Sequence, residues 1–239
     1  MSSDRCMRAP LLRHHPTPRP VPMISMTEIP VFRIDPVHPE PEVIRRAIEA
    51  LTAGDLVVAP TETRYGLLAR ADSDRAIERV YEAKGRGLLR PTALFVQNES
   101  GLRELGDMTA QAERLMKAFL PGPLTLVLRS RVDWAPPRVM DGLIGIRWSS
   151  SAVIRELVRQ IAFPVTATSA NLSGSEELEA TAQIREALGD AVSVYLDGGR
   201  LSGPVSTVVK CVGHDVTILR EGAISAELIR SQIRHGGGI

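Results

Sequence analysis

With 239 residues, 44% of them hydrophobic and 24% charged, the chain can bury a sizeable core and has the composition of an ordinary soluble globular protein. Its formal net charge of +1 argues against a protein that binds nucleic acid mainly through excess positive charge. No apolar stretch approaches the roughly 20 residues of a membrane span, and the N-terminal segment lacks the apolar middle of a secretory signal. We therefore expect a cytoplasmic protein without membrane contact.

The first segment, residues 1–26, differs in composition from the rest of the chain. It holds four arginines and one aspartate, a charge of +3 that leaves −2 for the remaining 213 residues. Five prolines interrupt it, and it lacks the apolar periodicity of a packed element. We expect residues 1–26 to be a disordered basic tail, and the natural start can be Met23 or Met26. The alternative is that this segment is a basic interaction arm. No linker divides residues 27–239, which we expect to form one domain.

Beyond Val31, apolar residues at helical spacing alternate with short apolar or β-branched runs. Helices are predicted at residues 43–51, 73–84, 109–120, 152–161, 181–188 and 225–234. Strands are predicted at residues 56–59, 93–96, 124–128, 144–148, 165–168, 192–196, 206–211 and 216–219. Interleaved strands and helices imply an α/β sheet with flanking helices, and the close spacing of the last strands implies that part of this sheet is antiparallel.

Three short segments place hydroxyls, amides and fixed positive charges on predicted strand ends and loops. They are PTETRYG at residues 60–66, KGR at residues 84–86 and TSANLSG at residues 168–174. An open α/β sheet binds anionic ligands at such positions. Together the three segments predict one nucleotide site.

Each segment also has a purely structural interpretation. Lys84 and Arg86 can converge on a polyanion or cap the helix that ends there. Ser169 and Asn171 can bind a ligand or form an Asx turn, and the threonines of PTETRYG can cap the following residues. Arg147 and Arg220 each end a predicted strand, where an arginine points into the crevice over the sheet or out to water.

Several catalytic signatures are missing from the sequence. It contains no GxxxxGK phosphate loop, GxGxxG turn, HExxH pair or GxSxG elbow. The five histidines are scattered, and the two cysteines, Cys6 and Cys211, form neither a disulfide framework nor a metal-ligand cluster. We therefore expect no resident metal, and the remaining cations and hydroxyls suit the positioning of a phosphate ester.

The order of eight segments between residues 31 and 224 resembles the YrdC/YciO-like threonylcarbamoyl-AMP synthase family. The segments are PTETRYG, KGR, PGPLTLVL, GIR, TSANLSG, DGG, STVV and ILREGAI. The resemblance implies a twisted open α/β fold with a large concave cavity that holds ATP and threonine. It also implies a nucleotidyltransferase that condenses L-threonine, bicarbonate and ATP, with Mg²⁺ on the ATP, to threonylcarbamoyl-AMP and pyrophosphate. Partner proteins would then transfer the activated group to tRNA.

The same resemblance assigns roles to particular residues. Lys84 and Arg86 would be the catalytic pair that holds the triphosphate, and Thr61 and Tyr65 would border the threonine. The full implied nucleotide site consists of Lys84, Arg86, Arg147, Ser169, Asn171, Ser206 and Arg220.

The sequence departs from the family pattern mainly in the threonine half. Arg64 stands where the family usually has an apolar residue, and Phe95 stands where many members carry a histidine. Smaller departures occur at Gly87, at Trp148–Ser149 and at Val205. Two alternatives therefore remain. One is a non-catalytic member that binds tRNA, double-stranded RNA or nucleotide. The other is a carbamoyl-adenylate-forming enzyme with a different acceptor.

Overall fold

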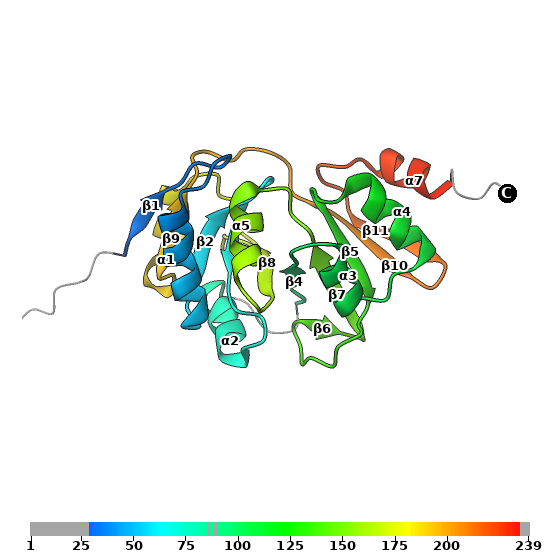
Figure 1. Ribbon diagram of the computed structural model, residues 1–239, viewed down its shortest axis with the longest axis horizontal. Coiled ribbons are helices and arrows are strands. Elements are labelled where there is room, and N and C mark those ends of the chain that lie inside the picture. Colours follow the sequence, from blue (N-terminus) through cyan, green and yellow to red (C-terminus); the bar gives the residue numbers. More distant parts are fainter. Residues whose placement is uncertain (1–28, 86, 88–89, 235–239) are drawn as a thin grey trace, which may run out of the picture.

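The computed structural model describes residues 29–85, 87 and 90–234, so the expected tail and Arg86 lie outside the described residues. Within these ranges eleven strands form one mixed sheet (Figure 1). In chain order they are β1 (Val31–Arg33), β2 (Val57–Pro60), β3 (Tyr65–Leu68), β4 (Ala93–Phe95), β5 (Leu124–Arg129), β6 (Val139–Met140), β7 (Leu143–Arg147), β8 (Val165–Ser169), β9 (Val194–Asp197), β10 (Thr207–Val212) and β11 (Asp215–Arg220).

The strand order is β1-β9-β2-β3-β8-β4-β7-β5-β10-β11, with β6 paired to β7. The pairs β1/β9, β9/β2, β4/β7 and β5/β10 are parallel. The other pairs are antiparallel, including the β10/β11 hairpin near the C-terminus. The mixed sheet predicted from the sequence is therefore confirmed.

Helices pack on this sheet. They are α1 (Pro41–Thr52), α2 (Asp74–Ala83), α3 (Glu99–Leu105), α4 (Ala110–Phe119), α5 (Ala152–Gln160), α6 (Thr181–Leu188) and α7 (Ala226–Arg234), with a 3-10 turn at Gly189–Ala191. The six predicted helices are all present, and the Ser73 hydroxyl caps α2 by accepting a hydrogen bond from the Ala76 amide. None of the helices in the described ranges is long and apolar enough to cross a membrane.

The sequence analysis missed β1, β3, β6 and α3. All four residues of β3 are buried, so this strand has no alternation of apolar and polar residues to reveal it. In α3 only Leu102 is buried, which gives no periodic stripe. The strand predicted at residues 192–196 begins instead at Val194, after the 3-10 turn.

The sheet is covered on both faces in one half of the molecule. Strands β2, β3 and β9 carry apolar side chains on both faces. One face packs on α1 and α5, and the other packs on α2 and α6. In β2, for example, Val57 and Ala59 face the first pair of helices while Val58 faces the second. Continuous apolar strands of this kind require helices on both sides.

In the other half, only one sheet face is covered by helices. Alternate residues of β5, β7 and β10 pack under α3, α4 and α7, and they are Leu124, Leu126, Leu128, Ile144, Ile146, Val209 and Cys211. The residues between them line a cavity on the opposite face, among them Thr125, Val127, Gly145, Arg147, Val208 and Lys210. The period-2 alternation of these strands therefore separates the core from the cavity wall.

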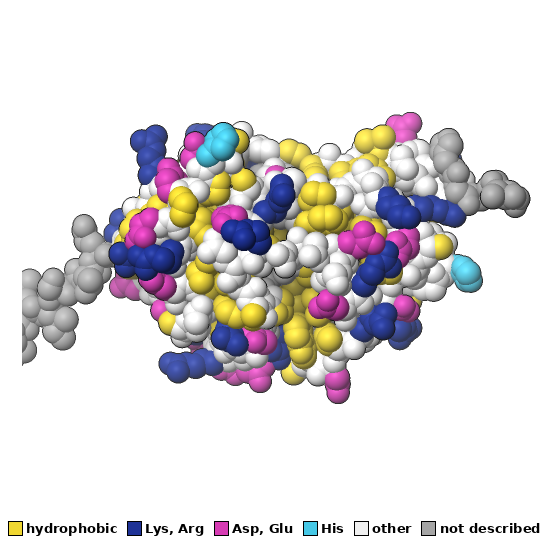
Figure 2. Space-filling view, in the orientation of Figure 1, with side chains coloured by type: hydrophobic (Ala, Val, Ile, Leu, Met, Phe, Trp, Pro, Cys, Tyr) yellow, Lys and Arg dark blue, Asp and Glu magenta, His cyan; other side chains and the backbone are white. Residues whose placement is uncertain are grey.

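Figure 2 shows the helix-covered face, on which side chains of both charge signs are interspersed. Several of these charges are neighbours on one helix. Arg45 pairs with Glu42 and Glu49 on α1, and Arg159 pairs with Glu156 on α5. Mixed, locally paired charges give this face no uniform positive potential for a nucleic acid backbone.

Candidate functional site

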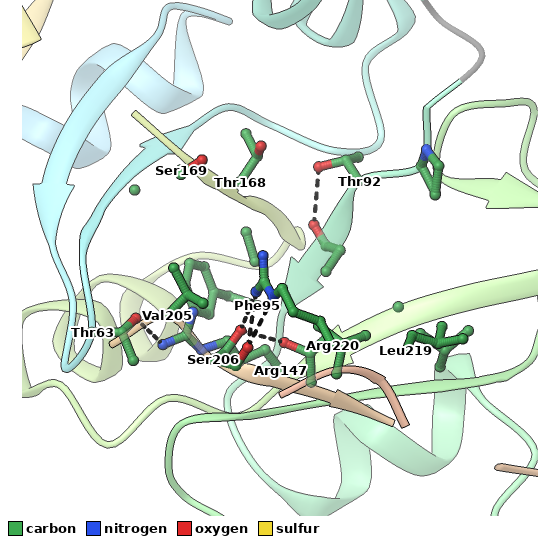
Figure 3. Close-up of a pocket in the computed structure, with 18 of the residues that line it drawn as sticks. Thr63, Thr92, Phe95, Arg147, Thr168, Ser169, Val205, Ser206, Leu219 and Arg220 are labelled. Atoms are coloured by element: carbon green, nitrogen blue, oxygen red, sulfur yellow. Dashed lines mark hydrogen bonds between the residues drawn. The ribbon is translucent and has the colours of Figure 1, made fainter. Parts of the chain in front are cut away.

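The cavity has a volume of about 480 Å³ and is formed by β3, β4, β5, β7, β8, β10 and β11 with their adjoining loops. This volume lies within the range of small-molecule sites. Its wall is apolar along Val127, Leu143, Val208 and Leu219, and polar where Arg147 and Arg220 enter (Figure 3). The cavity therefore combines an apolar surface with a concentrated positive charge.

Arg147 is the most deeply buried of the cavity arginines. It ends β7 and is 7% exposed. Its Nη2 donates a hydrogen bond to Thr63 Oγ1 at 2.7 Å and lies 3.0 Å from Glu62 Oε1. The guanidinium also lies 5.4 Å from the centre of the Phe95 ring, a cation–π distance. Phe95, one of the departures from the family pattern, thus supports an arginine that the sequence predicted for the site.

Arg220 has no carboxylate within ion-pair distance among the described residues. Its Nε and Nη2 donate to the Ser206 carbonyl at 3.2 and 2.9 Å, and Nη2 also donates to Ser206 Oγ at 3.1 Å. Burial lowers the pKa of Arg220; the Glu177 charge opposes this shift, and the Arg147 charge adds to it. The two arginines are therefore close enough to repel each other, which an anionic ligand would relieve.

Ser206 connects Arg220 to the floor of the cavity. Its hydroxyl lies 3.2 Å from Thr125 Oγ1, and both residues line the cavity. The structure thus brings together Arg147, Ser206 and Arg220, three residues for which the family resemblance implies a nucleotide-binding role.

Lys84 lies behind the TSANLSG turn rather than on the cavity wall. Its Nζ donates to the carbonyls of Ser169 and Asn171, the second at 2.7 Å, and the residue is 3% exposed. Within the turn, Ser169 Oγ donates to Asn171 Oδ1 at 2.6 Å, and Asn171 Nδ2 donates to the Ser175 carbonyl at 3.0 Å. Of Lys84, Ser169 and Asn171, only Ser169 is among the described residues that line the cavity. The triphosphate role of Lys84 stays a prediction, and it requires the ammonium to exchange carbonyls for phosphate.

Thr61 and Tyr65 both border the cavity, but their hydroxyls are used within the protein. Thr61 Oγ1 donates to the Arg64 carbonyl at 2.6 Å and accepts from the Thr63 amide at 3.1 Å, so it closes the turn. Tyr65 Oη donates to the Gly199 carbonyl at 2.6 Å, and burial raises the pKa of this phenol. This hydrogen bond from Tyr65 joins the DGG segment to PTETRYG.

Arg64 also lines the cavity and is held by acidic residues. Its Nη1 donates to the Leu201 carbonyl at 2.8 Å and to Glu179 Oε1 at 3.2 Å. Its Nε lies 4.0 Å from Glu177 Oε2, and Glu177 is a cavity residue too. The positive charge that replaces the usual apolar residue is thus balanced by carboxylates that follow TSANLSG.

Sequence reasoning missed Glu62, Glu177 and Lys210. Glu62 gave no signal beyond its place in PTETRYG, and Glu177 lies in a polar stretch without periodicity. Lys210 could have been found, because Val209 and Cys211 are apolar strand positions and place Lys210 on the opposite face.

Comparisons with known proteins agree with this architecture. A family model described as "Telomere recombination", and named for Sua5, YciO and YrdC, matches residues 49–222. A threonylcarbamoyl-AMP synthase from Bacillus subtilis is 36% identical over 194 residues, which cover 80% of this chain and 56% of the relative. A putative threonylcarbamoyl-AMP synthase from Mycobacterium tuberculosis is 37% identical over 190 residues, covering 77% of this chain and 85% of the relative.

A solved structure shows the same fold. Sua5 of P. abyssi, crystallised with L-threonine, superposes with a TM-score of 0.78 at 32% identity, covering 85% of this chain and 60% of that one. The chain thus spans little more than half the length of the B. subtilis relative, whereas the match to the M. tuberculosis relative is nearly complete. The family resemblance and the fold predicted from the sequence are confirmed, and the chain belongs to the Sua5/YciO/YrdC family.

Proposed function

We propose that the protein is a threonylcarbamoyl-AMP synthase whose cavity binds ATP beside L-threonine. The observation that carries this proposal is the pair of arginines at one end of the cavity. Among the described residues Arg220 has only uncharged acceptors, and Arg147 lies near enough to lower its pKa. A buried guanidinium at Arg147 beside a more exposed one at Arg220 is suited to a polyanion such as a triphosphate. The similarity to the threonylcarbamoyl-AMP synthase of B. subtilis and the putative one of M. tuberculosis supports the same activity.

The reaction needs little acid–base chemistry from the protein. The threonine amine and bicarbonate combine to a carbamate with loss of water. A carbamate oxygen then attacks the α-phosphorus of ATP, and the bond to pyrophosphate breaks. This transfer of the AMP group is a nucleotidyl transfer. The protein must hold two anions side by side and neutralise the departing charge, which are positioning and electrostatic tasks.

Arg147, Arg220 and Ser206 would hold the phosphates, and Ser169 would contact the nucleotide from the opposite wall. Lys84 and Asn171 would act by shaping the turn that presents Ser169, unless Lys84 exchanges its carbonyl partners for phosphate. Arg86 would join the triphosphate from the KGR segment. Thr61, Tyr65 and the Arg64 region would border the threonine.

Mg²⁺ would enter as part of the Mg·ATP substrate. The described residues hold no group of three histidine, cysteine or acidic side chains that could bind a metal. The phosphates would therefore supply the principal ligands, and the ion would neutralise charge on the leaving pyrophosphate.

The product is a reactive mixed anhydride, so a second reaction must consume it. We propose that partner proteins transfer its threonylcarbamoyl group to tRNA, as the family assignment suggests.

Pyrophosphate release tests the proposal. The protein is incubated with Mg·ATP and bicarbonate, with and without L-threonine, and compared with Arg220→Gln. We expect threonine-dependent release, lowered at least tenfold in the variant because a charge facing the phosphates is lost. Arg155→Gln, an exposed arginine on α5, is the matched control and should leave the rate unchanged. Binding of ATP without threonine-dependent release would overturn the synthase assignment and favour another acceptor.

A further inference from the structure

Lys210 is a cation on the cavity wall to which the proposed function assigns no role. It lies on β10 between Val209 and Cys211, which pack in the core under α4 and α7. Strand alternation therefore directs Lys210 to the opposite face, where it lines the cavity with Val208 and Val127.

The part of the chain that the structure describes offers the Lys210 ammonium no partner. Lys210 is partly buried, and among the described residues it has neither an ion pair nor a hydrogen bond. The neighbouring wall is made of Val127, Leu143, Val208 and Leu219. A lysine in such a wall must extend its ammonium toward the water that fills the cavity, or toward a ligand.

The other cations of the cavity all have partners. Arg147 is paired with Glu62, and Arg64 is paired with Glu179. Arg220 is held by the Ser206 carbonyl but not by a carboxylate. Arg220 and Lys210 are thus the cavity cations without an acidic partner in the described chain, and both belong to the β10/β11 hairpin.

The register of the hairpin sets the spacing of the two charges. Val208 is opposite Arg220, and Lys210 is opposite Thr217, so the two cations stand two residues apart along the strands. This offset corresponds to roughly 6.5 Å along the strand direction, and with the spacing between neighbouring strands it gives a backbone separation of about 8 Å. One hairpin therefore presents two cations without an acidic partner among the described residues at neighbouring points of the same cavity.

We infer that Lys210 is a further ligand-binding residue, which contacts a second anionic group of the substrate while Arg220 and Arg147 contact the first. This inference rests on the proposed function and makes it more specific. The second group is either a distal phosphate of ATP or the carboxylate of the amino acid. Both are anions that a lysine ammonium binds by charge-assisted hydrogen bonds.

Calorimetric titration with ATP, AMP and L-threonine distinguishes a distal phosphate from the amino-acid carboxylate as the group that Lys210 contacts. If Lys210 contacts a distal phosphate, Lys210→Ala should weaken ATP binding roughly tenfold and leave AMP binding unchanged, and Lys210→Arg should restore ATP affinity. If it contacts the carboxylate, Lys210→Ala should weaken L-threonine binding in the presence of ATP and spare ATP itself. Unchanged affinity for all three ligands would overturn the inference.

Two controls keep the outcomes separate. Lys117→Ala removes an exposed lysine from α4, far from the cavity wall, and should leave every affinity unchanged. Thermal melting of each variant shows whether the fold is retained. If the unaltered protein does not bind ATP, the proposed function fails together with this inference. If it binds ATP and Lys210→Ala binds all three ligands equally well, only the inference about Lys210 fails.

Discussion

At the scale of single residues, the site is a balance between cations and the carboxylates that hold them. Glu62 fixes Arg147, and Glu179 fixes Arg64, so these two guanidiniums are already oriented before a ligand arrives. Orientation in advance lowers the entropic cost of binding. Glu177 is different, because it lines the cavity itself and its charge acts on Arg220.

Glu177 should therefore oppose the binding of anions. Glu177→Gln removes a negative charge from the cavity, and we expect it to tighten ATP binding by roughly three- to tenfold at low salt. Glu176→Gln is the matched control, since Glu176 is exposed and does not line the cavity. Titration calorimetry of both variants checks this expectation, and weaker ATP binding by Glu177→Gln would contradict it.

The buried thiol of Cys211 should make stability depend on alkaline pH. Burial raises the pKa of Cys211 to about 12, whereas the unfolded thiol titrates near 8.5. The folded state keeps its proton in this window, so stability is fully present below about pH 8.5 and falls as pH rises further. The slope is up to about 1.4 kcal/mol per pH unit. Burial also raises the pKa of Tyr195 to about 12, which adds a loss at higher pH.

Urea unfolding of the protein and of Cys211→Val at about pH 8 and pH 10 isolates the thiol. We expect the unaltered protein to lose up to about 2 kcal/mol more than the variant between these pH values. Equal losses in the two proteins would show that the thiol titrates normally in the folded state.

The family resemblance, rather than a local pattern, gave Arg147 and Arg220 a role in the site; the structure places both on the cavity wall, and their contact with a nucleotide stays a prediction. Arg147 and Arg220 end strands, so alternation and strand direction place them at the cavity. Lys84 ends a helix, where the last turn permits several directions, and its ammonium binds backbone carbonyls instead. The roles of Glu62 and Glu177 depend on contacts between segments far apart in the chain, which a local pattern does not reveal.

At the scale of elements, the site depends on how β11 and the following turn pack against the segment before β10. Gly222 lies two residues after Arg220, and a Cβ at this position would stand 2.2 Å from the Val205 carbonyl oxygen. The Gly222 amide also donates to Thr207 Oγ1 at 3.0 Å. Close contact of these two backbones places Ser206 beneath the Arg220 guanidinium.

Gly222→Ala should therefore damage both stability and binding. We expect a loss of about 1–3 kcal/mol in unfolding free energy and weaker ATP binding, because the backbone at Val205–Ser206 must move. Gly54→Ala is a matched control: Gly54 has a φ of +84° but nothing within 4 Å of an added Cβ, so it should lose stability without losing ATP affinity. Unfolding and titration of both variants check this, and normal ATP binding by Gly222→Ala would refute the packing argument.

Helices and strands whose apolar residues recur at a regular spacing were predicted correctly, and the missed elements lack such a regular spacing. Helices such as α2 and α5 have a continuous buried stripe, and β5 alternates between core and cavity. β3 is buried on both faces, so tertiary packing rather than local pattern defines it. Short elements such as β6 form only because a neighbouring strand offers hydrogen bonds.

At the scale of the whole molecule, the candidate site exists because helices cover the two faces of the sheet unequally. Helices cover both faces of the sheet around β2, β3 and β9, and only one face around β5, β7 and β10. The uncovered face becomes the cavity, with apolar strand residues as its surface and strand-end arginines at one end. The order of motifs predicted this fold, but the cover of each face depends on long-range packing that single segments do not encode.

If the proposed function is right, this cavity joins bicarbonate, threonine and the AMP part of ATP in one product. The most direct test supplies carbon-13-labelled bicarbonate with Mg·ATP and L-threonine, and analyses the products by mass spectrometry. We expect threonylcarbamoyl-AMP carrying one labelled carbon, with pyrophosphate formed in equal amount. A labelled adenylate of another amine, or AMP and pyrophosphate formed without any labelled adenylate, would contradict this expectation.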